Sequence, residues 1–332
     1  MLNNLLARRN NLIWMLFHVF LGVLCVYSKW FLIIWFYLFI LLNINKVITN
    51  LFNNNVSDYL LPFITYLSTF EVLGRMVKSY PYLPWELSKY ILLFCTLFLL
   101  IIRRINSPHL SGLLLILLLV PGILIDQSNR VGLPELISNL LGPLSMCGFM
   151  ICFANLTISN VMLNNLLRII WLTVIPVLVF SIIQTPDFKD ISFQLGAVAE
   201  TAGGFGSNQV SSVLGLGMFL SYYAWMNKLL FTGIHSLDGI FIGLFAYQGL
   251  MTFSRGGILV GLIAMLIYYI LFRSSGLFKE HIRKKSLRPL LFFGFALMIF
   301  SASYVIIENR SEGQITLRYL GETFGTLSGN KI

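Results

Sequence analysis

The sequence is poor in charged residues. Only 11% of its 332 residues are charged and 57% are hydrophobic, whereas a typical soluble domain is about 25% charged. This balance excludes an ordinary soluble globular domain and indicates a polytopic membrane protein. The net charge of +10 does not indicate nucleic-acid binding, because the lysines and arginines fall in short segments between apolar runs, where they report membrane orientation.

Cysteine and histidine are also scarce, with four of each. The cysteines all lie in apolar stretches, without ligand-like spacing and without a histidine partner, which argues against both a disulfide framework and a zinc site. No carboxylate cluster suited to magnesium is apparent. We therefore expect no metal and no cofactor. The cysteines are Cys25, Cys95, Cys147 and Cys152.

The sequence contains many long apolar runs. At about 20 residues per crossing, they predict an all-α, polytopic transmembrane bundle of about eleven spans that forms one domain over residues 1–332. The run at 57–74 is the weakest, because Asp58 begins it and Glu71 interrupts its end. The expected spans are 11–28, 30–48, 57–74, 87–102, 110–125, 137–155, 163–184, 207–226, 236–252, 257–273 and 289–307.

The distribution of lysine and arginine predicts the orientation. The segment 273–288 holds six of them and should be cytoplasmic. Threading the spans alternately from this segment leaves the N-terminus in the cytoplasm. It places on the outer face a glycine-containing loop at 185–207 and a C-terminal segment at 308–332. We expect the latter to be the start of a large outer loop that is truncated here.

Five arginines gather on this expected outer face. Guanidinium groups suit bidentate binding of phosphate oxygens, and an arginine surrounded by membrane-spanning sequence is a functional candidate. For Arg75, an ion pair with Glu71 one helical turn away is the structural alternative. The five are Arg75, Arg130, Arg255, Arg310 and Arg318.

Two short motifs accompany these arginines. The first, Gly-Gly-Phe-Gly-Ser-Asn-Gln at 203–209, is a glycine-rich turn that opens a helix, where backbone N–H groups attract anions. The second, Thr-Phe-Ser-Arg-Gly-Gly at 252–257, contains Ser254 and Arg255. The structural alternative is that the glycines only bend the chain or allow close helix packing, while Ser207, Asn208 or Ser254 caps a helix.

The order of these motifs, with apolar helices and a basic loop between them, resembles the O-antigen ligase and polymerase superfamily of integral membrane glycosyltransferases. The resemblance covers residues 200 to 325 or so. It implies an undecaprenyl-diphosphate-linked glycan donor, a glycan, protein or lipid A core acceptor, and a role in lipopolysaccharide or other surface polysaccharide biosynthesis. It also implies a location in the bacterial inner (cytoplasmic) membrane, among membrane lipids, with a periplasmic active face.

The resemblance also implies roles for particular residues. Arg255 and Arg318 would be catalytic, and Gly206 and Asn208 would bind the diphosphate or the glycan. From the arginine chemistry and the second motif we add Arg75, Arg130, Arg310 and Ser254 as binding residues. Fixed arginines would stabilise the negative charge on the leaving diphosphate without a metal.

A general base must take the proton of the acceptor hydroxyl, and the sequence leaves it unknown. The family commonly uses a histidine of the large outer loop, but no histidine of this chain is expected on that face. If the chain is complete, four carboxylates are to be considered. The histidines are His18, His109, His235 and His281, and the carboxylates are Glu71, Asp126, Glu200 and Glu322.

The chemistry leaves three alternatives to ligation. A repeat-unit polymerase uses the same donor as a ligase and differs in its acceptor. A transporter or flippase of lipid-linked or anionic solutes also has many spans and arginines, although transporters tend to show internal repeats and interrupted helices, which this sequence does not show. A structural membrane subunit would tolerate alanine at Arg255. The pattern favours an enzyme, a metal-independent membrane glycosyltransferase.

Overall fold

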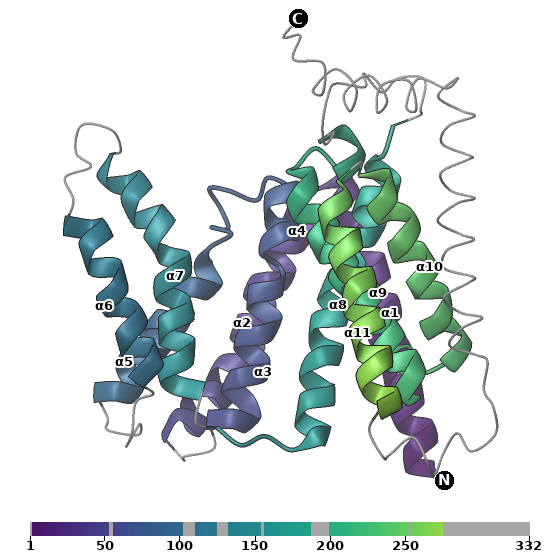
Figure 1. Ribbon diagram of the computed structural model, residues 1–332, viewed down its shortest axis with the longest axis horizontal. Coiled ribbons are helices and arrows are strands. Elements are labelled where there is room, and N and C mark those ends of the chain that lie inside the picture. The colour runs from purple at the N-terminus through teal and green to yellow at the C-terminus, as the bar shows by residue number, and fades with distance from the viewer. Residues whose placement is uncertain are drawn as a thin grey trace, which may run out of the picture. The chain divides into compact units, whose positions relative to one another are not determined.

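A computed structural model describes residues 2–52, 56–101, 110–124, 132–153, 156–186, 199–252 and 254–274. Every regular element in these ranges is a helix (Figure 1), so the expected all-α class is confirmed for them. The elements are α1 (Leu2–Tyr27), α2 (Trp30–Phe52), α3 (Val56–Thr69), α4 (Glu71–Met76), α5 (Leu87–Ile101), α6 (Leu110–Leu124), α7 (Leu133–Phe153), α8 (Asn160–Gln184), η2 (Glu200–Ala202), α9 (Ser207–Asn227), α10 (His235–Met251) and α11 (Arg255–Ser274).

Three of the described helices are long and apolar enough to cross a membrane. They cover Arg9–Tyr27, Trp30–Thr49 and Asn160–Gln184. Shorter apolar helices lie at Leu87–Ile101, Leu110–Pro121, Ser138–Ile151 and Gly256–Leu271. The span expected at 289–307 and the outer segment expected at 308–332 lie outside the described residues. The number of spans and their orientation stay predictions.

The weakest expected span, 57–74, is divided into two helices. α3 ends at Thr69, and α4 begins at Glu71 after Phe70. The short α4 has an acidic residue in its first turn and a basic residue, Arg75, in its last. Both charges therefore complement the dipole of α4, whereas in one continuous helix through this segment Glu71 would lie near the C-terminal end, where an acidic residue is unfavourable.

The chain packs as two compact units, and the division falls inside α8. Unit 2 comprises residues 28–173, and unit 1 comprises residues 1–27 and 174–332. In unit 2, α2 and α3 meet through aromatic side chains: the indole N–H of Trp35 donates to the Tyr66 hydroxyl at 2.7 Å, and Phe39 stacks on Tyr66. On α7, Gly148 lies against Thr96 of α5. Small and aromatic residues thus set the helix spacing in this unit.

Unit 1 contains the helices that follow both motifs. α9 lies between α10 and α11, and a glycine faces each neighbour. Gly217 lies against the ring of Phe245 on α10, so that a Cβ there would come within 2.6 Å of the ring. Gly215 lies against the backbone of Gly257 on α11. Because glycine has no side chain, the three helix axes approach closely.

Candidate functional site

The first motif forms the turn that begins α9. Gly203 and Gly204 have positive φ angles of 69° and 77°, a conformation that residues with a Cβ rarely adopt. The N–H of Gly204 closes the turn by donating to the carbonyl oxygen of Ala199 at 2.9 Å. The expectation that glycines bend the chain here is therefore confirmed for these two residues.

Helix α9 then begins at Ser207 without the expected side-chain cap. Gly206 occupies the N-cap position and makes no side-chain hydrogen bond, whereas Ser207 and Asn208 are the first two helical residues. Gly206 has a negative φ of −39°, and a Cβ there would make only ordinary contacts with Gln209. The fold therefore does not require glycine at this position.

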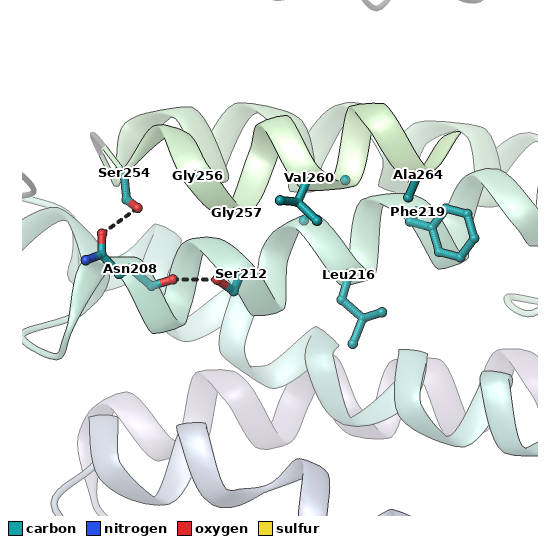
Figure 2. A pocket seen from close by; sticks show the side chains of 11 residues that line it. Asn208, Ser212, Leu216, Phe219, Ser254, Gly256, Gly257, Val260 and Ala264 are labelled. Atoms are coloured by element: carbon teal, nitrogen blue, oxygen red, sulfur yellow. Dashed lines mark hydrogen bonds between the residues drawn. The ribbon is translucent and has the colours of Figure 1, made fainter. Parts of the chain in front are cut away.

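The second motif lies beside the first. The hydroxyl of Ser254, the residue before α11, donates to Oδ1 of Asn208 at 2.8 Å (Figure 2). In addition, the hydroxyl of Ser211 donates to the carbonyl oxygen of Ser254 at 2.7 Å. Residues 46 positions apart in the sequence are thus joined, and both hydrogen bonds hold the start of α11 against the first turns of α9.

Glycines keep α9 and α11 together beyond this point. A Cβ at Gly257 would overlap backbone atoms of Ser211, and one at Gly261 would lie 2.7 Å from the carbonyl oxygen of Gly215. Because the contacts advance in the same direction along both helices, α9 and α11 run parallel. Their N-termini, which carry partial positive charge, therefore lie at the same end of unit 1.

A groove of about 580 Å³ runs along this helix pair. At the helix N-termini it is lined by three polar residues, Asn208, Ser212 and Ser254, which we call the polar mouth. Asn208 is exposed, and since its Oδ1 accepts from Ser254, its Nδ2 is the group left to donate. The first N–H groups of an α-helix have no acceptor within the helix. The Ser212 and Ser254 hydroxyls both donate to Asn208, and the N–H of Gln209 donates to the carbonyl oxygen of Gly206. The polar mouth therefore offers the Asn208 amide and the first backbone N–H groups of the helices as donors, and none of its lining residues is acidic.

Only part of the expected arginine cluster can be placed. Arg255 is the first residue of α11 and directly follows Ser254 of the polar mouth, although its side chain lies outside what the structure describes. Arg130, Arg310 and Arg318 also lie outside the described residues.

Arg75 lies in unit 2, where carboxylates surround it. Its Nη2 lies 2.7 Å from Oε1 of Glu71 and 3.4 Å from Oε1 of Glu86, and Lys89 lies 2.9 Å from the same Glu71 oxygen. The guanidinium also covers the ring of Trp85. The Glu71–Arg75 ion pair is thus present, as the four-residue spacing predicted. We call Glu71, Arg75, Glu86 and Lys89 the charged cluster.

The candidate general bases also lie in different parts of the chain. Glu71 belongs to the charged cluster, whereas Glu200 is exposed at the start of η2, just before the glycine turn. His18 is buried, and its Nδ1 lies 2.7 Å from the carbonyl oxygen of Trp14. His235 stacks on Trp225 near the C-terminal end of α9, far along the helix from the polar mouth. The others, Asp126, Glu322, His109 and His281, lie outside the described residues.

The close helix packing that the sequence suggested for Gly256 and Gly257 is present at Gly257 and not at Gly256. Sequence reasoning missed the other residues that bring the motifs together. Ser211 and Gly215 on α9 face Gly257 and Gly261 on α11. Each pair is four residues apart, the small-xxx-small spacing of closely packed membrane helices, so the signal was present in the sequence. Gln248 was missed as well. It donates to the Thr185 hydroxyl at 3.0 Å and to the Thr201 carbonyl oxygen at 3.3 Å, which holds η2 and the end of α8 to α10.

Among the described residues, no group of three histidine, cysteine or acidic side chains could hold a metal ion. Comparisons with models of protein families, with curated proteins and with solved structures found no match. The two motifs, the polar mouth and the groove are therefore the features of the described chain that bear on function.

Proposed function

We propose that the protein transfers a glycan from an undecaprenyl-diphosphate carrier to an acceptor at the outer face of the bacterial inner membrane. A ligase acting on a lipid A core, glycan or protein acceptor is the first candidate. The observation that supports it most is the hydrogen bond between Ser254 and Asn208. It joins the two motifs on which the resemblance to O-antigen ligases and polymerases depends, and nothing in their sequence separation required them to meet.

The polar mouth supplies the donors that a diphosphate needs. The N–H groups in the first turns of α9 and α11 and the Asn208 amide are positioned before any ligand arrives, and Arg255 begins α11. Two glycines at this place, Gly206 and Gly256, are not required by packing, since a Cβ at Gly256 would meet nothing within 4 Å. Bare backbone at these positions would allow phosphate oxygens to approach closely.

In the proposed reaction, the acceptor hydroxyl oxygen attacks C1 of the donor sugar. The bond between C1 and the diphosphate oxygen breaks, and its electron pair stays on the diphosphate, where the fixed donors stabilise the added charge. The hydroxyl proton passes to a base. Of the carboxylates considered from the sequence, Glu200 is the described one that is exposed and lies beside the turn into α9, and we assign it this role.

The proposal includes the eleven-span topology, with a cytoplasmic N-terminus and a periplasmic site. That topology requires the spans at 207–226 and 257–273 to run in the same direction, and the parallel packing of α9 and α11 supports it. Arg130, Arg310 and Arg318 would reach the same face, with Arg318 as a second arginine acting on the leaving group.

The test is Arg255→Ala in purified protein reconstituted into vesicles with an undecaprenyl-diphosphate-linked donor and an acceptor. We expect the transfer rate to fall about 100- to 1,000-fold, the usual cost of removing one fixed donor to developing charge. The protein level should stay normal. Lys228→Ala, at the opposite end of α9, is the control and should transfer at the wild-type rate. Wild-type transfer by Arg255→Ala would overturn the proposal.

Cells carrying Arg255→Ala distinguish transfer from transport. If the protein is a transferase, surface glycan is lost while the lipid-linked precursor still reaches the outer face. Accumulation of precursor on the cytoplasmic face would instead support a flippase. Product length separates the two transfer reactions, because a ligase attaches a finished chain once, whereas a polymerase lengthens it unit by unit.

A further inference from the structure

The backbone that carries Glu200 is held in place from outside its own helix. Glu200 begins η2, which has only three residues, and the N-cap residue Ala199 supplies no side-chain hydrogen bond. Glu200 itself is exposed, and its side chain makes no hydrogen bond or ion pair with the other described residues. A single helical turn is not stable alone, so the position of Glu200 depends on whatever fixes η2.

The two residues that follow Glu200 attach η2 to the interior of unit 1. Thr201 and Ala202 are completely buried. The Thr201 carbonyl oxygen lies 3.3 Å from the amide Nε2 of Gln248 on α10 and 3.3 Å from the hydroxyl of Thr185, the residue after α8. The backbone beside Glu200 is thus attached to two longer helices.

Gln248 supplies the hydrogen for this attachment. Its side chain is buried, with 1% of the residue exposed, and Nε2 carries two hydrogens. One is donated to the Thr185 hydroxyl oxygen at 3.0 Å and the other to the Thr201 carbonyl oxygen. Thr185 has a single hydroxyl hydrogen, and the nearest acceptor for it is the Ser181 carbonyl oxygen at 2.6 Å. The link to Thr201 is therefore made by the amide of Gln248.

The amide is also suited to this position by its lack of charge. Methionine has a similar length but no hydrogen to donate, and an ionised glutamate would only repel the Thr201 carbonyl oxygen. A lysine could donate, but it would bring a buried positive charge close to the backbone of Glu200. Gln248 holds η2 without adding a charge that competes for the carboxylate.

The same helix leads directly to the second motif. Gln248 lies in the last turn of α10, and the N–H of Ser254 donates to the hydroxyl of Thr252, the residue that follows the helix, at 3.3 Å. Ser254 in turn donates to Asn208 (Figure 2). The segment from Thr201 to Asn208 is therefore bonded at both ends to the segment from Gln248 to Ser254. These two connections set the distance between η2 and the polar mouth.

We propose that Gln248 is a positioning residue that holds Glu200 where it can take the proton of the acceptor hydroxyl. The inference rests on the proposed function for the role of Glu200. Gln248 is buried and does not touch the substrate. Without its amide, Glu200 is no longer fixed, and a displacement of about 1 Å near the reacting atoms can lower a rate about 100-fold. Donor binding is retained, because the bond between Ser254 and Asn208 remains.

The first test is Gln248→Met in the vesicle assay of glycan transfer. We expect kcat to fall about 10- to 100-fold, while KM for the lipid-linked donor stays within about twofold of wild type. Thr185→Val, which removes the second partner of the amide, should lower kcat less, and Thr185→Ser, which keeps the hydroxyl, should restore it. Tyr247→Phe, at the exposed neighbouring position, is the control and should transfer at the wild-type rate.

A double-mutant cycle separates positioning from a general loss of structure. Glu200→Gln keeps the shape of the side chain but cannot take a proton, so it should be slow by itself. Because Gln248 acts through Glu200, adding Gln248→Met to Glu200→Gln should lower kcat no further. An equal fall in both backgrounds would overturn the inference. So would a wild-type kcat in both Gln248→Met and Thr185→Val, with thermal unfolding measured for each.

Hydrogen exchange tests the attachment without any substrate. The N–H groups of Ala202 and Gly204 both donate to the Ala199 carbonyl oxygen, so they report on η2. In Gln248→Met they should exchange about tenfold faster than in wild type or in Tyr247→Phe. Unchanged exchange would overturn the inference. Faster exchange in a protein whose wild type transfers no glycan would contradict the proposed function, and with it the role of Glu200, while the attachment of η2 by Gln248 stands.

Discussion

The charged cluster of unit 2 contains an arginine, Arg75, and the polar mouth of unit 1 is followed directly in the chain by another, Arg255. In the charged cluster, Arg75 faces Glu71 and Glu86, and Lys89 shares one of the carboxylate oxygens. In the polar mouth, Asn208 and Ser254 bond to each other, and no acidic residue lines the groove. The first arrangement uses up its charges internally. The second leaves donors that a ligand can satisfy. The positions of the arginines in the sequence do not distinguish these two arrangements.

The largest effect is expected on stability, at the place where α9 and α11 touch. Gly257→Val would place side-chain atoms among backbone atoms of Ser211, so the helices must separate. We expect a loss of about 3 kcal/mol or more of stability, together with loss of the polar mouth. The loss of stability is measured by thermal unfolding in detergent and by the protein level.

The neighbouring glycine supplies the control for this packing prediction. A Cβ at Gly256 meets nothing within 4 Å, so Gly256→Ala should unfold at the wild-type temperature or slightly above, since alanine favours a helix. It controls for folding only, because Gly256 lies in the proposed site. Equal stability of Gly257→Val and wild type would show that the close contact is unimportant.

The second-largest effect is expected when an acidic charge is added to the polar mouth. Asn208→Asp keeps an acceptor for the Ser254 hydroxyl and puts a carboxylate in the first turn of α9, which should stabilise the helix by about 0.5 kcal/mol. The same change removes the Nδ2 donor and repels a diphosphate. We expect glycan transfer to fall about 100-fold, measured beside thermal unfolding.

Gln209→Glu is the matched control for charge. It adds the same negative charge at the next exposed residue of α9, which does not line the groove. Transfer should fall far less than in Asn208→Asp. If both variants lose activity equally, the effect is one of general charge at this face and the polar mouth has no special role.

The smallest effect concerns the charged cluster. Arg75→Ala leaves Glu71 and Glu86 without their guanidinium, and we expect a loss of about 1–2 kcal/mol after allowing for partial exposure. Transfer per folded molecule should be retained. Lys89→Ala, which removes one ion pair, should cost about 0.5 kcal/mol or less. Normal stability combined with lost transfer in Arg75→Ala would mean that Arg75 binds substrate, as the sequence suggested.

Local features of the site could be predicted because they depend on neighbouring residues. The glycine turn at 203–204, the start of α9 near residue 207 and the Glu71–Arg75 pair all follow from conformational freedom or from spacing along one helix. The division of the span at 57–74 was not predicted, since a polar residue near the end of an apolar run does not reveal whether the helix continues or restarts.

The sequence by itself determined that the described chain is helical and apolar, and it located the two motifs. Composition and periodicity suffice for that, because they reflect each segment's preference for hydrocarbon or water. Only the tertiary structure decided that Asn208 meets Ser254, that the backbones of α9 and α11 touch, and that Glu86 joins Glu71 beside Arg75. These facts depend on which helix faces pack together, and that choice is made by glycine contacts between segments distant in the chain.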